Sequence, residues 1–253
     1  AVVQLGGHPI YTRGDEVGFD TREPVEDVAR IMEGYHALIA ARVFDHLTVT
    51  RMAAVVDVPV YNMLSDHSHP LQAFADALTM QQCLGELSGK TVAYVGDFNN
   101  VARSLAEVSA MLGMHVRLAC PHGFDAPLVE LERFGLLGAA SVEQSTRPAD
   151  AVEEAHAVHT DTWVSMGQEA EKQERLQQFE GYTVDDRMMA LADPAAVFMH
   201  CLPAYRGIEV AAGVIDGAQS VVFQQGHNRL HAARGAMAFL LGARPHPDPV
   251  DPE

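Results

Sequence analysis

Two short segments carry side chains that can hold or transfer a proton. Residues 161–167 (Asp-Thr-Trp-Val-Ser-Met-Gly) combine a carboxylate, hydroxyls and the only tryptophan of the chain, and a carboxylate in such a loop can hold an ammonium group. Residues 200–203 (His-Cys-Leu-Pro) leave the Cys201 thiol at a predicted strand end, before a proline that stops the strand. A lone cysteine is more often a small buried apolar residue than a nucleophile. The position of Cys201 among other polar loops makes it a candidate.

A second group of side chains suits an anion. Residues 66–72 (Asp-His-Ser-His-Pro-Leu-Gln) open a predicted helix, and a helix N-terminus attracts anions. Arg42 and Arg229 are the arginines best placed to reach a shared crevice, although each could equally be a surface salt-bridge partner. Cations converging on one cleft would suit a small phosphate-bearing substrate. His67 and His69 could instead bind a metal, but no third ligand follows at a matching spacing, so a metal site is not favoured.

Residues 96–100 (Gly-Asp-Phe-Asn-Asn) form a glycine turn between a predicted strand and a predicted helix. The turn lacks the second and third glycines of the dinucleotide-binding pattern, which argues against NAD binding. Asn99 and Asn100 could simply cap the helix, which is the favoured interpretation for such a pair taken alone. Alternatively, one of the two amides points into the crevice and fixes a polar ligand.

The elements that must position these residues alternate between strand and helix, which predicts parallel α/β sheets. We predict helices that begin near residue 24 and span about 45–56, 70–84, 127–134 and 228–241. A further helix follows residue 100, with four apolar residues facing inward, namely Val101, Leu105, Val108 and Leu112. We predict strands at 58–62, 91–95, 115–120, 157–160, 196–201 and 220–223, with a further apolar run at 37–43. The polar, glycine-flanked segment 85–90 is the predicted domain boundary. The fold class is therefore α/β with two domains, each a parallel sheet flanked by helices, and the C-terminal helix returning to the first domain.

Composition excludes several classes of function. The chain has 253 residues, of which 48% are hydrophobic, so it can bury a sizeable core. Its formal net charge of −17 disfavours nucleic acid and anionic membrane surfaces as partners. The three cysteines lack a C-x-x-C spacing, which argues against a disulfide framework or a zinc site. No apolar run approaches the length of a membrane span, and no signal-peptide pattern opens the chain.

Five motifs in order resemble a known family. They are 69–72 (His-Pro-Leu-Gln), 96–100, 161–167, 200–203 and Asn228-Arg229. With these spacings, the chain resembles the ornithine carbamoyltransferases of the aspartate/ornithine carbamoyltransferase superfamily over essentially its whole length. The Ser-Met-Gly and His-Cys-Leu-Pro motifs separate the ornithine enzymes from the aspartate and putrescine enzymes.

This resemblance implies an enzyme that transfers the carbamoyl group of carbamoyl phosphate to the δ-amine of L-ornithine, giving citrulline and phosphate in arginine metabolism. It implies that carbamoyl phosphate is held by Arg42, His69, Gln72, Cys201, Leu202 and Arg229. It implies that ornithine is held by Asn100, Asp161, Ser165 and Met166. The implied catalytic residues are Cys201, Asp161, His69 and Arg42, with the proton passing to the Cys201 thiolate or to the phosphate. No cofactor or metal is implied.

The implied domains are 1–84 for carbamoyl phosphate, 85–227 for ornithine, and 228–253 as a C-terminal helix and tail. Members of the family are usually built from trimers, so a homotrimer or a multiple of trimers is expected, with no nucleic acid or membrane partner. Lys90 and Lys172 are the only lysines against many arginines, which favours GC-rich coding and a bacterial cytoplasm.

The chain departs from the family at its start. The Ser-Thr-Arg-Thr-Arg type phosphate loop of the family does not occur, and residues 1–9 match the segment just after that loop. We therefore expect the N-terminal part of the first domain to be absent, leaving an exposed sheet edge and low activity. Two alternatives stay open, namely a carbamoyltransferase for another amine and a non-catalytic homologue that binds carbamoyl phosphate or ornithine.

Overall fold

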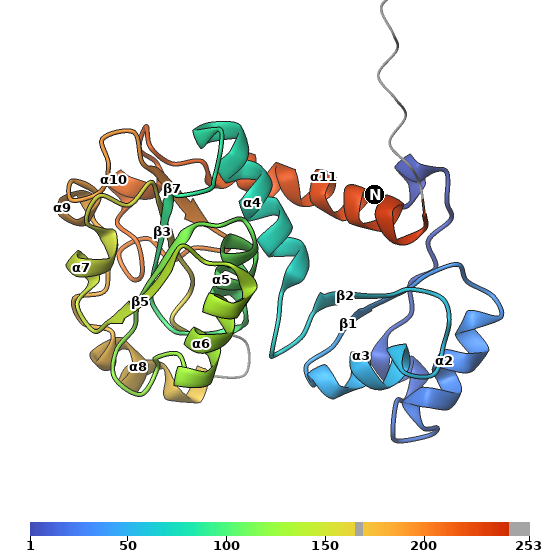
Figure 1. The fold of residues 1–253 in the computed structure, drawn as a ribbon. Coiled ribbons are helices and arrows are strands. Elements are labelled where there is room, and N and C mark those ends of the chain that lie inside the picture. Colours follow the sequence, from blue (N-terminus) through green and yellow to red (C-terminus); the bar gives the residue numbers. More distant parts are fainter. Residues whose placement is uncertain (165–168, 243–253) are drawn as a thin grey trace, which may run out of the picture. The chain divides into compact units, whose positions relative to one another are not determined.

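The computed structural model describes residues 1–164 and 169–242, which divide into two compact units (Figure 1). The first unit comprises Ala1–Asp66 together with the chain from Leu230 onward, and the second comprises His67–Arg229. Within the described residues, none of the helices combines the length and the apolar character needed to cross a membrane. The domain boundaries after residues 84 and 227 remain a prediction.

The first unit is a two-stranded parallel sheet with short helices. Its elements are η1 (Val3–Leu5), α1 (Gly14–Val17), α2 (Val25–Glu33), β1 (Ile39–Arg42), α3 (His46–Ala53) and β2 (Val60–Leu64). Strands β1 and β2 pair in parallel, with Ile39 opposite Val60. Helix α3 begins where the Asp45 side chain accepts a hydrogen bond from the Leu47 N–H at 2.8 Å, as an N-cap aspartate does. Apolar residues of α2, α3 and the two strands form the core of this unit.

The second unit is a five-stranded parallel sheet. Its strands are β3 (Thr91–Val95), β4 (His115–Ala119), β5 (Ser141–Ser145), β6 (Ala157–Thr160) and β7 (Val197–His200). Its helices are α4 (Pro70–Leu84), α5 (Asn100–Met111), α6 (Leu128–Leu137), α7 (Pro148–Val152), η2 (Glu169–Glu171), α8 (Lys172–Gln178), α9 (Asp186–Met189) and α10 (Ala212–Ile215), together with the start of α11 (Val222–Leu240). All residues of β3 are buried, as expected for a central strand covered on both faces.

The strand order of this sheet is β5-β4-β3-β6-β7. The chain runs outward from β3 through β4 to β5, and then returns to place β6 on the other side of β3. The order therefore reverses between β3 and β6, and in parallel α/β sheets the crevice at such a reversal is where ligands bind. The Thr160 hydroxyl at the end of β6 donates to the Val95 carbonyl of β3 at 2.6 Å, which ties these two strand ends together.

The α/β class with parallel sheets flanked by helices is confirmed, but some predicted elements are wrong. Residues 220–223 do not form a strand, because Val222 begins α11, six residues before the predicted helix start. Strand β5 was not predicted at all. An apolar run as short as Val221-Val222-Phe223 fits a strand or a buried helical turn equally well. Leu112, predicted to face inward, lies at the end of α5 and is exposed.

Candidate active site

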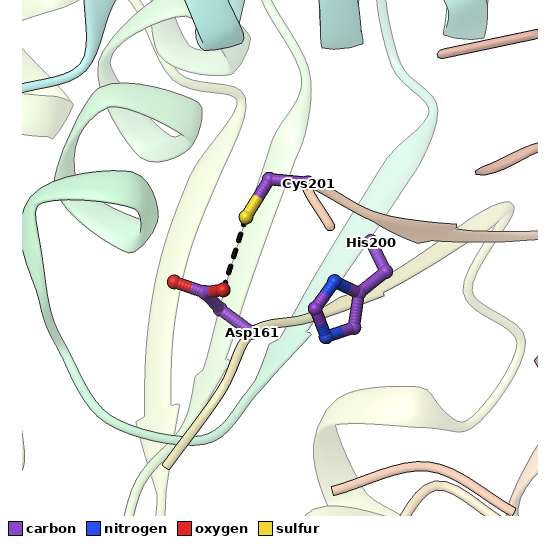
Figure 2. Close-up of side chains that lie close together, drawn as sticks. All are labelled: Asp161, His200 and Cys201. Atoms are coloured by element: carbon purple, nitrogen blue, oxygen red, sulfur yellow. Dashed lines mark hydrogen bonds between the residues drawn. The ribbon is translucent and has the colours of Figure 1, made fainter. Parts of the chain in front are cut away.

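A hydrogen-bonded thiol and carboxylate lie at the carboxyl ends of two neighbouring strands. Asp161 directly follows β6, and Cys201 directly follows β7. The Cys201 Sγ donates to Asp161 Oδ1 at 3.0 Å (Figure 2). The Thr162 N–H also donates to Oδ1, at 2.8 Å. The predicted pair is therefore brought together, at the edge of the sheet where a ligand would bind.

The surroundings of Cys201 favour the neutral thiol. Burial, followed by the negative charge of Asp161 and the hydrogen bond to it, raises the pKa of Cys201 well above its ordinary value. The positive charge of Arg229 acts in the opposite direction on this pKa. Both Asp161 and burial disfavour a thiolate. At neutral pH Cys201 is therefore a hydrogen-bond donor in this arrangement.

The loop after β3 contributes an asparagine that has two roles. The Asn99 side-chain oxygen caps α5 by accepting from the Val101 and Ala102 N–H groups at 2.9 and 3.0 Å. Its amide nitrogen donates to Asp161 Oδ2 at 2.8 Å, across the reversal between β3 and β6. Capping and orientation of a polar group are thus combined in one residue. Asn100, the predicted ligand, is the first residue of α5 and is half-buried.

A buried ion pair fixes the loop that carries Asn99. The Arg175 guanidinium binds the Asp97 carboxylate and also donates from Nε to the Trp163 carbonyl at 2.5 Å. The guanidinium carbon lies 4.8 Å from the ring centroid of Phe124. Burial raises the pKa of Asp97, and the charge of Arg175 opposes that rise. Arg175 therefore joins the loop after β3 to the loop after β6.

Three of the predicted carbamoyl-phosphate residues lie at the start of α4 or directly after Cys201. His69 is the buried N-cap residue of α4, and its N–H donates to Ser104 Oγ at 2.9 Å. Gln72 is buried one turn further along. Leu202 adopts a left-handed backbone with φ of 57°, a conformation that branched residues rarely adopt and that recurs at functional sites.

The remaining predicted residues are placed differently. Arg229 is exposed on α11, in the second unit. Arg42 is the exposed last residue of β1, in the first unit. Ser165 and Met166 lie outside the described residues. The structure thus brings Asp161 and Cys201 together and adds Asn99, which the sequence signalled only through its asparagine pair.

Asp161, His200 and Cys201 are the only group of three potential metal ligands within the described ranges, with ligand atoms within 4.8 Å of one another. The imidazole of His200 is already engaged, because Nδ1 accepts from the Leu202 N–H at 2.9 Å and Nε2 lies 3.2 Å from Glu209 Oε1. Figure 2 shows the thiol directed toward Asp161. These hydrogen bonds account for the cluster without an ion.

A doubly wound parallel sheet with polar side chains at its reversal point defines an α/β protein that binds a small polar ligand. Residues 1–82 match the family model described as aspartate/ornithine carbamoyltransferase, carbamoyl-P binding domain. Residues 88–240 match the model described as aspartate/ornithine carbamoyltransferase, Asp/Orn binding domain. The chain belongs to the aspartate/ornithine carbamoyltransferase family.

Similar proteins carry consistent names. The chain is 46% identical over 241 residues to an ornithine carbamoyltransferase of Thermus thermophilus, covering 95% of this chain and 78% of that protein. It is 45% identical over 248 residues to an ornithine carbamoyltransferase of Acidothermus cellulolyticus, covering 96% of this chain and 79% of that protein. The solved structure of ornithine carbamoyltransferase from Pyrococcus furiosus superposes on this chain with a TM-score of 0.90 at 41% identity. The match covers 96% of this chain and 78% of that chain.

Proposed function

We propose that this protein is a transferase that moves the carbamoyl group of carbamoyl phosphate to the δ-amino group of L-ornithine, giving L-citrulline and phosphate. The observation that carries this proposal is the thiol and carboxylate pair of Cys201 and Asp161 at the reversal point of the sheet. The relatives named above as ornithine carbamoyltransferases support the choice of substrates.

The amino acid lies beside Asp161 in this proposal. The Asp161 carboxylate is held by the N–H of Thr162 and the amide of Asn99, so its orientation is set before a ligand arrives. A fixed carboxylate binds and orients an amine by a charge-assisted hydrogen bond. We assign Asn100, Asp161, Ser165 and Met166 to ornithine, the last two from the resemblance alone.

Carbamoyl transfer requires a neutral amine and a stabilised leaving group. The δ-nitrogen forms a bond to the carbonyl carbon, the bond from that carbon to the bridging phosphate oxygen breaks, and the proton lost by nitrogen ends on phosphate. Because the pKa of Cys201 is raised, phosphate is the better proton acceptor and the thiol serves as a donor. We assign Arg42, His69, Gln72, Cys201, Leu202 and Arg229 to carbamoyl phosphate. In this assignment Arg42 and His69 stabilise charge on the carbonyl oxygen and the phosphate.

We also propose the wider setting from the resemblance. Residues 1–84, 85–227 and 228–253 are the carbamoyl-phosphate domain, the ornithine domain and the C-terminal segment. The protein acts in the bacterial cytoplasm in arginine metabolism, as a homotrimer or a multiple of trimers. Light scattering of the purified chain measures the assembly directly.

The test of function is citrulline formation from ornithine and carbamoyl phosphate. Putrescine and N-acetylornithine are offered in parallel as alternative amines. Formation of citrulline that needs both substrates and disappears in Asp161→Ala supports the proposal. If another amine is carbamoylated faster than ornithine, that amine is the substrate. If ornithine binds but no product forms, the protein is a non-catalytic homologue.

A further inference from the structure

A chain of buried side-chain amides runs through the second unit beside the candidate site. The N–H of His200, the last residue of β7, donates to Gln225 Oε1 at 2.9 Å. A backbone N–H can only donate, so the oxygen of the Gln225 amide must face β7. The nitrogen of that amide faces the other way and donates to Asp76 Oδ1 at 2.7 Å. The orientation of Gln225 is therefore fixed by the backbone.

Asp76 passes this orientation on to Gln72. Its Oδ1 also accepts from Gln72 Nε2, at 2.8 Å, one turn earlier on α4. A carboxylate oxygen accepts hydrogen bonds, so Gln72 must present its nitrogen to Asp76 and its oxygen in the opposite direction. Asp76 and Gln225 are fully buried, and Gln72 is 1% exposed. Bulk water does not compete for bonds this deeply buried, and each amide has one favoured orientation.

The oxygen of Gln72 is left without a partner. Among the residues that the structure describes, Gln72 Oε1 is a buried acceptor that receives no hydrogen bond. An unpaired buried acceptor is costly, and a ligand that supplies an N–H removes that cost. Carbamoyl phosphate carries an NH₂ group on its carbonyl carbon, and an acyl phosphate with a methyl group in that position has no donor.

We propose that Asp76 is a positioning residue that, held by Gln225, fixes the Gln72 amide with its oxygen directed away from Asp76, so that the site selects a carbamoyl group over an acyl group of the same shape. The proposal rests on the proposed function, which gives Gln72 to carbamoyl phosphate. It adds the reason why Gln72 acts as an acceptor and assigns a role to Asp76 and Gln225.

The test uses two stable ligands that differ only at this position. Phosphonoacetamide carries NH₂ on its carbonyl carbon, and acetonylphosphonate carries CH₃ there. We expect calorimetry with the full chain to give about tenfold tighter binding of the amide, the size of effect expected for one satisfied buried acceptor. Equal binding of the two ligands by the unaltered chain would overturn the proposal.

Two neutral replacements of Asp76 separate hydrogen bonding from charge. In Asp76→Asn, the Gln225 nitrogen still requires an oxygen opposite it, so the oxygen of the introduced amide takes the place of Oδ1. Gln72 then still faces an acceptor, and the preference should persist. In Asp76→Leu the acceptor is gone, the Gln72 amide can rotate, and the preference should fall toward unity. Loss of the preference in Asp76→Asn, or its retention in a folded Asp76→Leu, contradicts the proposal.

If Asp76→Leu does not fold, Gln72→Met provides a second test of the proposal. This change removes the acceptor itself, so the amide preference should disappear while Asp76 remains, and a retained preference overturns the proposal. Thr79→Val is the matched control, because Thr79 is buried on the same helix but bonds the Ala75 carbonyl and Asn228 outside this chain of amides. It should leave the ratio of the two affinities unchanged.

These measurements keep the two proposals apart. An unaltered chain that binds neither phosphonate, and forms no citrulline, contradicts the proposed function. An unaltered chain that forms citrulline but binds both phosphonates equally contradicts only the role of Asp76. If Asp76 had a merely structural role, its substitution would weaken the binding of both ligands by the same factor, and the ratio of the two affinities would not change.

Discussion

At the scale of single residues, the neutral state of Cys201 decides what the site can do. The thiol donates to Asp161 and has a raised pKa, so in the proposed reaction it orients the carboxylate rather than abstracting a proton. A serine in its place would still donate a hydrogen bond, but its Cβ–Oγ bond is shorter than the Cβ–Sγ bond and its oxygen is smaller than the sulfur. The position of the carboxylate relative to the proposed amine would then change.

Cys201→Ser should therefore lower kcat much more than it weakens carbamoyl-phosphate binding. We expect a fall in kcat of about tenfold or more, within the range of a displaced proton-transfer or orienting group, and a change in Kd of about twofold or less. Steady-state citrulline formation and calorimetry with phosphonoacetamide measure the two quantities. An unaltered kcat would contradict a role for Cys201 in turnover.

The charge of Asp161 should control the reactivity of Cys201. Burial is the largest cause of the raised pKa of the thiol, and the charge of Asp161 is the next. Asp161→Asn should therefore lower the pKa and increase the thiolate fraction at any pH below it. We expect Cys201 in Asp161→Asn to react with iodoacetamide at pH 8 at least about threefold faster than in the unaltered chain. Peptide mass spectrometry follows the reaction. The exposed Cys83 is the internal control, since its rate should not change, and an equal or slower rate at Cys201 would contradict the assignment.

The sequence indicated Asp161, Cys201, His69 and Gln72 because each belongs to a short local motif. It did not indicate Asp76 or Gln225. These two residues are 149 positions apart and meet only when α4 and α11 pack, so no local pattern carries the signal. The sequence likewise showed an asparagine pair without showing that Asn99, rather than Asn100, hydrogen-bonds Asp161.

At the scale of elements, helix α5 and the candidate site depend on the same side chain. Asn99 caps α5 through its oxygen and holds Asp161 through its nitrogen. The start of the helix and the orientation of the carboxylate are therefore coupled. Two substitutions can separate them, because a serine caps a helix but is too short to reach Asp161.

Asn99→Ser should keep the stability and lower the affinity for ornithine. Serine caps about as well as asparagine, so the free energy of unfolding should stay within about 0.5 kcal/mol, whereas Asn99→Ala should lose about 1 kcal/mol. Both variants should raise the KM for ornithine. Urea unfolding and citrulline kinetics provide the measurements. A wild-type KM in Asn99→Ser would show that Asn99 serves only as a cap.

Most elements could be predicted because the apolar periodicity and the glycine turns are strong. Helix α4, for example, runs from Pro70 to Leu84 as predicted. Strand β5 was missed because Ser-Val-Glu-Gln-Ser contains a single aliphatic residue, and this strand lies at an edge of the sheet with pairing on one side. Strand pairing, rather than local pattern, makes it a strand.

At the scale of the whole molecule, the two units contain sheets of different size. Among the residues that the structure describes, the first unit has two paired strands and the second has five. The stability of a small sheet depends more heavily on the elements packed against it, because few of its backbone groups are hydrogen-bonded on both sides. In β3 every residue is buried, whereas β1 alternates between buried and exposed residues.

Amide hydrogen exchange should therefore distinguish the units. Peptides that cover β3 and β6 should exchange at least about tenfold more slowly than peptides that cover β1 and β2, because they open only in the larger unfolding event. Mass spectrometry after peptic digestion measures this, with the fully unfolded chain in denaturant as the reference for intrinsic rates. Equal protection would mean that the two units unfold as one cooperative body.

The backbone origin of the Gln225 orientation constrains how this protein can evolve. A side chain can be replaced by mutation, but the N–H of His200 is present whatever residue occupies that position, proline excepted. The direction of donors and acceptors from β7 to α4 therefore has a permanent starting point. Single substitutions at Gln225 or Asp76 can interrupt this direction without removing the donor from which it starts. A lineage that lost the preference for a carbamoyl group could therefore do so through one substitution at position 72 or at position 76.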